Sequence, residues 1–164
     1  MKRILTFILV VAMLAACSVT AFAEVNQDSD PQQQSAVISA DVEPAYIVSI
    51  PADTTVAFNA EYTDFGAVEL TSARLEPNKC VKVTLTTDGE LNNSADDTKV
   101  IPYTIVEGKA DSATDTAYTT ASYLAAGDKT DLTIKIAQDD WNKAAAGHYG
   151  DTVTFDITYT DVSD

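Results

Sequence analysis

The chain has 164 residues, of which 25 are acidic and 10 basic, and its formal net charge is −15 at pH 7. So negative a chain repels phosphate backbones and anionic lipid headgroups, which excludes nucleic acid as an expected partner. The length suits one domain built around one hydrophobic core.

The first 23 residues predict a secretory signal peptide. Lys2 and Arg3 precede an apolar run over residues 4–16, and Ala21-Phe22-Ala23 forms an A-x-A cleavage site. The apolar run is shorter than the roughly 20 residues that a membrane-spanning helix needs. We therefore expect an extracellular or cell-surface protein of a bacterium, with no membrane span and with residues 1–23 excluded from the fold.

A second interpretation of the same segment stays open. Leu14-Ala15-Ala16-Cys17 resembles the lipobox of bacterial lipoproteins, in which Cys17 would carry the lipid. The residues that follow, SVTAFAEV, are still apolar, whereas a lipoprotein usually continues with a polar tether. Secretion after cleavage at Ala23 is the first expectation, and lipid attachment at Cys17 is the alternative.

Residues 24–34, with the sequence EVNQDSDPQQQ, show no apolar pattern and predict a flexible polar tether. The only cysteine beyond Cys17 is Cys80, so cleavage after Ala23 would leave no partner for a disulfide within the chain. Cys80 begins a predicted strand with the parity of its polar face, and we expect it to be partly exposed.

Short segments with alternating apolar and polar residues dominate residues 35–164, which we expect to form a single domain. They cover residues 35–42, 45–50, 54–59, 65–72, 81–87, 99–106, 131–136 and 152–159. The segments are rich in Val, Ile, Thr and Tyr, which suit a sheet with one wet face. About seven or eight such strands without a long amphipathic helix predict an all-β, antiparallel, Ig-like β-sandwich.

One short helical turn is predicted before the last strand, within AQDDWNKAAAG. Asp139 and Asp140 lie where a helix start favours acidic residues, and Gly147 is expected to stop the helix. Trp141 is expected to cap one end of the sandwich.

The turn Gly147-His148-Tyr149-Gly150 leads into the last strand. The two glycines let the chain reverse tightly, with positive φ where required. We expect the ring of Tyr149 to cover the sandwich edge while its hydroxyl bonds a nearby backbone group. The last strand directs Val153, Phe155, Ile157 and Tyr159 inward, and we expect it to pair in the middle of a sheet.

The closing stretch AAGHYGDTVTFDITY resembles the end of bacterial pilin-like and spore-coat-protein-U-like domains. In those domains a Gly-x-Tyr turn and an alternating Thr/Val strand end an Ig-like sandwich, and VIPYTI and DLTIKI stand here in the expected order. The resemblance covers residues 37–159 in pattern but only the end of the chain in motif. It implies a small exported sandwich protein. Chaperone-assembled pilins usually carry an early disulfide, and Cys80 has no partner for one.

Motifs for catalysis or metal binding are absent from the sequence. His148 is the single histidine and lies in the turn, and there is no G-x-S-x-G, zinc-ligand spacing or phosphate-binding glycine loop. We therefore expect neither an enzyme nor a cofactor. Acidic pairs such as Asp96-Asp97 and Asp139-Asp140 leave calcium as an alternative, although they lack the D-x-D-x-D-G spacing.

The expected function is that of a structural or adhesive surface protein, including a fibre-type subunit, with other surface proteins or further copies as partners. Residues 37–42 follow the tether and resemble a donor strand, but they equally suit the first strand of their own domain. The alternative function is a carbohydrate- or ligand-binding module. It is less favoured because Trp141 is the sole tryptophan and most tyrosines face inward.

Overall fold

The computed structural model describes residues 25–28, 33 and 35–162. Cys17 and the predicted signal peptide lie outside these residues. Contacts between residues divide the chain into one unit up to Asp41 and a second from Val42 onward. In the first unit, residues 35–41 form neither helix nor strand. All strands among the described residues belong to the second unit.

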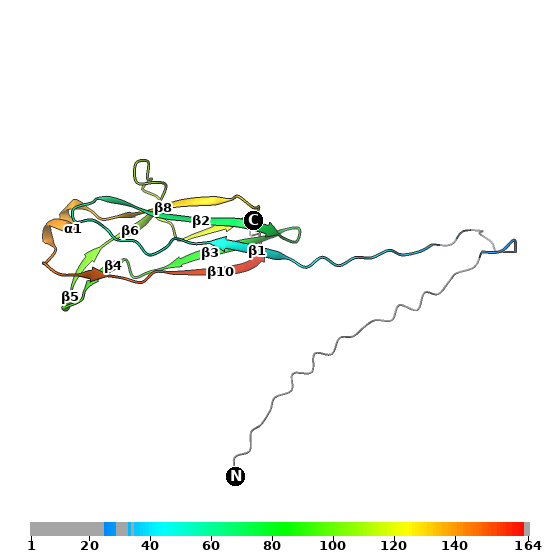
Figure 1. Cartoon of the computed structure of the whole chain (residues 1–164), viewed down its shortest axis with the longest axis horizontal. Coiled ribbons are helices and arrows are strands. Elements are labelled where there is room, and N and C mark those ends of the chain that lie inside the picture. The colour runs from blue at the N-terminus through cyan, green and yellow to red at the C-terminus, as the bar shows by residue number, and fades with distance from the viewer. Residues whose placement is uncertain (1–24, 29–32, 34, 163–164) are drawn as a thin grey trace, which may run out of the picture. The chain divides into compact units, whose positions relative to one another are not determined.

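The second unit is all-β, as predicted, with antiparallel pairing throughout the described strands (Figure 1). Its one described helix is α1 (Gln138–Lys143), at the position expected from Asp139 and Asp140. The strands are β1 (Ala45–Ser49), β2 (Tyr62–Arg74), β3 (Lys79–Thr86), β4 (Glu90–Asn93), β5 (Asp96–Pro102), β6 (Thr104–Glu107), β7 (Thr120–Tyr123), β8 (Lys129–Lys135), β9 (Tyr149–Gly150) and β10 (Thr154–Asp161).

These strands form three sheets. The four-stranded sheet has the order β1-β2-β8-β6, the β3 sheet has the order β10-β3-β7, and the β4 sheet has the order β5-β4-β9. The first two sheets face each other, since the ring of Phe65 on β2 lies 6.3 Å from that of Phe155 on β10. The core fills the space between them, and most of it comes from β2, β3, β6 and β8.

Alternation predicted most of the buried positions correctly. The buried residues that it placed inward are Val68, Leu70, Val81, Val83, Ile101, Tyr103, Ile105, Leu132, Ile134 and Ile136. The stretch expected as one strand over residues 99–106 is divided at Tyr103, because β5 and β6 belong to different sheets. Tyr103 lies between the two strands and is still buried, and its hydroxyl forms hydrogen bonds with the Asp151 carboxylate and the Thr87 hydroxyl.

Two alternating segments do not form the expected strands. Residues 35–42 are extended without a partner strand, and Ile38 is 96 % exposed. Residues 54–59 belong to no strand, and Phe58 is exposed while its ring meets Trp141 edge-on at 5.7 Å. Alternation creates one apolar face, but a strand also needs a neighbour for its backbone groups.

Cys80 is buried, contrary to the expected partial exposure. Its Sγ lies 3.8 Å from the carbonyl oxygen of Asp161 at the end of β10. The prediction was wrong because the parity of Cys80 at the start of its strand did not take account of the paired strand. The end of β10 lies against the thiol and helps to bury it.

Candidate functional site

β10 lies at the edge of the β3 sheet, where the sequence had predicted a central strand. In the order β10-β3-β7, β3 pairs with β10 on one side, and no described strand pairs with β10 on the other. The clean alternation of β10 did indicate a strand with one face on the core. It carries no information on whether that strand has one neighbour or two, and this is why the prediction was wrong.

The core-facing side chains of β10 are unusually open. Ile157 is paired in register with Val83, so the two side chains share the inner face of the sheet. Val83 is fully buried, whereas Ile157 is 40 % exposed. Phe155 and Tyr159 share this face and are only partly buried. A side chain that faces the core and still meets solvent marks a side of the sandwich that is not closed.

The backbone of β10 is open on the same side. The N–H of Val162 donates to the carbonyl of Asn78 at 2.9 Å, and the N–H of Leu85 on β3 donates to Thr119, towards β7, at 2.8 Å. Antiparallel pairing alternates inward and outward backbone groups. The N–H and C=O groups of Phe155, Ile157 and Tyr159 therefore point away from β3, and they offer a template for an added strand.

β1 borders this opening from the facing sheet (Figure 1). Tyr46 of β1 is 38 % exposed and its ring stacks on that of Tyr159, with 5.9 Å between centroids. Ile50, directly after β1, is 46 % exposed. We call the set Tyr46, Ile50, Phe155, Ile157 and Tyr159 the open edge. It is an apolar stripe along unpaired strand backbone.

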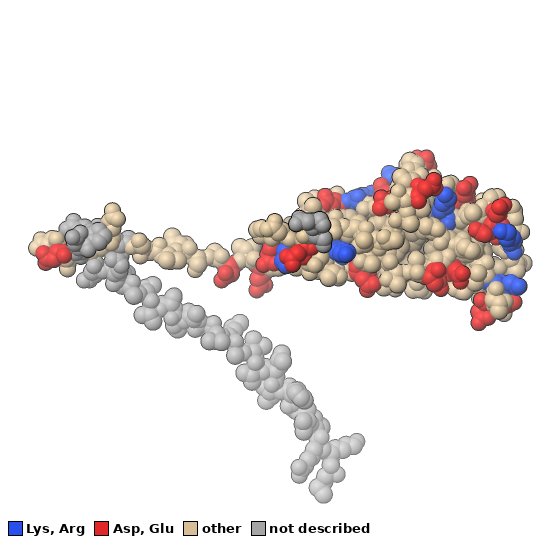
Figure 2. Space-filling model, turned by 180° about the vertical axis from the view of Figure 1, so that it is seen from behind, with Lys and Arg blue, Asp and Glu red and all other residues tan. Residues whose placement is uncertain are grey.

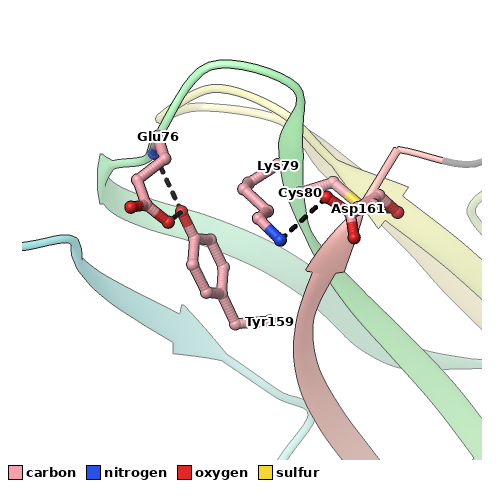
Figure 3. Close-up of polar contacts among 5 residues, drawn as sticks. All are labelled: Glu76, Lys79, Cys80, Tyr159 and Asp161. Atoms are coloured by element: carbon pink, nitrogen blue, oxygen red, sulfur yellow. Dashed lines mark hydrogen bonds and ion pairs between the residues drawn. The ribbon is translucent and has the colours of Figure 1, made fainter.

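A polar cluster fixes one end of the open edge (Figure 3). The hydroxyl of Tyr159 accepts a hydrogen bond from the Glu76 N–H at 2.8 Å. Lys79 and Asp161 form an ion pair with 2.7 Å between Nζ and Oδ1. The hydrogen bond to Asp161 raises the pKa of the Lys79 ammonium above its usual value. These contacts join the end of β10 to β3 and to the turn that precedes β3.

Tyr149 lies at β9, away from the open edge. It is paired with Asn93 of β4, and its hydroxyl donates to the carbonyl of Ala145 at 2.9 Å. This is the local backbone hydrogen bond that the sequence predicted. The ring is half-buried and packs against the core cluster.

The two glycines of the turn differ. A Cβ at Gly147 would overlap the side-chain amide of Asn93, which is itself buried and accepts a hydrogen bond from Ala95 N–H at 2.9 Å. Gly147 is therefore required by close packing. Gly150 lies in β9 without positive φ, and a Cβ there would meet open space, so neither backbone conformation nor close packing requires glycine at this position. The helix also ends at Lys143, before Gly147 is reached.

Trp141 is a buried residue of α1, and α1 lies at one end of the sandwich (Figure 1). Its indole Nε1–H donates to the carbonyl of Ala60 at 2.9 Å, which joins the helix to the loop before β2. His148 is exposed in the turn, and its carbonyl accepts from the Ser94 N–H at 2.8 Å. Trp141, Gly147 and Tyr149 thus make contacts at this end of the molecule and are not part of the open edge.

Within residues 25–28, 33 and 35–162, no three acidic, His or Cys side chains are grouped in a way that could hold a metal ion. The same residues contain no helix of the length and apolar character needed to span a membrane. The open edge was missed from the sequence. Its side chains were correctly assigned inward. The alternation of apolar and polar residues, however, does not show whether β10 has a neighbour strand on its outer side.

A comparison with curated proteins found no match. Among solved structures, the chain is similar to one from the work titled "Chaperone-tip adhesin complex is vital for synergistic activation of CFA/I fimbriae biogenesis". The identity is 12 % and the TM-score 0.42, over 72 % of this chain and 43 % of that one. The chain therefore spans less than half of that protein.

Residues 1–18 match the prokaryotic membrane lipoprotein lipid attachment site. The match ends directly after Cys17, the residue that the lipobox interpretation assigned to the lipid. It favours lipid attachment over the free secretion that was the first expectation. The chain is thus an exported protein of the bacterial cell surface with a lipoprotein attachment site.

Proposed function

We propose that the protein is a non-enzymatic structural or adhesive subunit of the bacterial surface, and that its copies associate by strand addition at the open edge. The observation that carries this proposal is Ile157, a core-facing residue that is 40 % exposed. It lies on a strand whose outer side has no partner among the described residues. Such an edge favours β-augmentation by an extended segment.

Residues 35–42 of a second copy, which we call the donor segment, suit the open edge. The segment equals β10 in length and is already extended without a partner. Ile38 and Val42 are both exposed and fall on the same face of an extended chain. That face consists of Ala36, Ile38, Ala40 and Val42, whereas the opposite face consists of Ser35, Val37, Ser39 and Asp41.

The energetics favour a weak association between isolated copies. Burying Ile38, Val42 and Ile157 would contribute roughly 1.5–3 kcal/mol for each side chain that becomes fully buried. Ordering the donor backbone costs about 1–2 kcal/mol per residue, which backbone hydrogen bonds of about 0.5–1.5 kcal/mol each offset only in part. Both partners are acidic, with Asp41 on one and Asp156 on the other. Association should therefore strengthen with salt and with concentration.

Light scattering of the purified protein tests the proposal. We expect the mass to rise with concentration and salt, and we expect Ile157→Lys or Ile38→Lys to abolish the rise. Thr158→Lys is the matched control, because Thr158 is exposed on the outer face of the same strand. A protein that stays monomeric at every concentration and salt would remove the proposal. So would a Thr158→Lys variant that loses association as fully as Ile157→Lys.

A further inference from the structure

We infer that copies joined through the open edge lie side by side along the membrane and do not extend from it as a fibre. This inference rests on the proposed strand addition and on the lipid attachment site. It concerns the kind of partner that the open edge receives, namely a neighbouring copy held to the same membrane by its own lipid.

The length of chain between the lipid and the donor segment limits how far from the membrane the donor segment can reach. Residues 18–34 separate Cys17 from Ser35, which is 17 residues. A fully extended chain spans at most about 3.6 Å per residue, so this connection reaches roughly 60 Å from the lipid. As a flexible coil its average span would be only about 20–25 Å. The open edge that receives the donor segment must therefore lie close to the membrane that holds the donor.

The same limit applies to every joint of a longer assembly. Each copy contributes its own donor segment and its own lipid, so each accepting edge must lie within reach of a lipid. A unit of the size of residues 42–162 measures about 35 Å across, from the usual scaling of compact domains. In a stack away from the membrane, the joint between the second and third units would lie about 70 Å from the membrane by the same scaling, which exceeds the reach of the tether. Lateral growth keeps all donors within reach.

Confinement to the membrane also strengthens the association, which is weak between isolated copies. Lipid attachment raises the effective concentration of neighbouring copies, which offsets the cost of ordering the donor segment. Asp and Glu are spread over the face shown in Figure 2, and the formal net charge is −15. This charge repels anionic headgroups, so the open edge stays available to a neighbour.

Cross-linking in intact cells tests the inference. The full chain would carry Ile38→Cys and Ile157→Cys, and oxidation would join donor and acceptor into a ladder of multimers. We expect the ladder to stay with the membrane fraction after shearing and every band to contain a lipidated N-terminal peptide. The matched control adds Cys17→Ala, which leaves the A-x-A site at Ala21–Ala23 for cleavage. Its cross-linked multimers should appear in the medium, and the ladder should be weaker and shorter because the released copies are no longer concentrated at the membrane.

The outcomes separate the two proposals. A ladder that shears off, or whose bands carry an unlipidated N-terminus at Glu24, overturns the inference and leaves strand addition standing. Atomic force microscopy of multimers on a supported bilayer gives a second test. If the height of the multimers increases with their length, the inference is overturned and strand addition stands. A height that stays at that of one copy supports lateral growth. The absence of a ladder in both backgrounds removes strand addition and the inference with it.

Discussion

The two lateral sides of the sandwich are closed to different extents. On the β6–β7 side, a segment between the sheets provides backbone partners, since Val106 pairs with Ala117 and the N–H of Tyr118 donates to the Ile105 carbonyl at 2.9 Å. On the β1–β10 side, no described segment plays this part. The difference shows that apolar side chains alone do not close a sheet edge, and that a backbone partner is also required.

The burial of the side chains differs between the two sides in the same way as the backbone pairing does. Tyr118 and Tyr123 on the closed side are buried, and their hydroxyls lie 3.2 Å apart, with Tyr123 donating onward to Thr130 at 3.1 Å. Burial raises the pKa of the Tyr118 hydroxyl above its usual value. Tyr159 on the open side is only partly buried and bonds an exposed turn residue, Glu76. The closed side thus serves stability, and we assign binding to the open side.

The largest expected effect is on the closed side. Tyr118→Ala removes a buried ring and should lower the free energy of unfolding by about 3–5 kcal/mol. Tyr118→Phe keeps the ring and removes one hydrogen bond, so about 1 kcal/mol is expected. Urea unfolding followed by circular dichroism measures both. Equal effects of the two substitutions would show that packing of the ring is not what closes this side.

Val83 and Ile157 allow a direct comparison, because they are opposite each other on one face. Val83→Ala should cost about 2 kcal/mol, since Val83 is fully buried. Ile157→Ala removes more atoms but should cost only about 1 kcal/mol in the monomer, because much of the side chain already meets solvent. The test is unfolding at low protein concentration. A larger loss for Ile157→Ala would mean that the edge is covered.

Tyr149 should matter for stability and not for association. Tyr149→Ala should cost about 2 kcal/mol, because it removes a half-buried ring that packs on the core. His148→Ala, at the neighbouring exposed position, is the control and should change stability by less than about 0.5 kcal/mol. Thermal unfolding measures both. An unchanged melting temperature for Tyr149→Ala would refute its role at the turn.

A smaller, pH-dependent effect is expected at Asp128, in the turn before β8. The N–H groups of Leu124 and Ala125 donate to its carboxylate at 2.7 and 2.9 Å and lower its pKa. Its contribution to stability is therefore present above the unfolded pKa of about 3.9 and is lost as pH falls through the lower folded value. The gap in stability between the native protein and Asp128→Asn should shrink below about pH 4. A gap that is constant with pH would contradict this.

Alternation was sufficient to predict the all-β fold and the inward faces of β2, β3 and β8, because burial on one face imposes a period of two. The acidic start of α1 likewise indicated the helix at Trp141. The pairing between strands that are distant in the sequence could not be predicted from alternation. Ile157 was correctly assigned inward, yet its exposure depends on a neighbour strand that no local pattern records. The same reason explains why residues 35–42 alternate like a strand and pair with none.

Hydrogen exchange at β10 tests the central claim most directly. In dilute monomer, we expect fast exchange at the amides of Phe155, Ile157 and Tyr159, which point outward, and slow exchange at those of Asp156 and Thr158, which bond β3. Under conditions that produce multimers, the three outward amides should become slow as well. Outward amides that are already protected in the monomer, or that stay fast in the multimer, would contradict strand addition at the open edge.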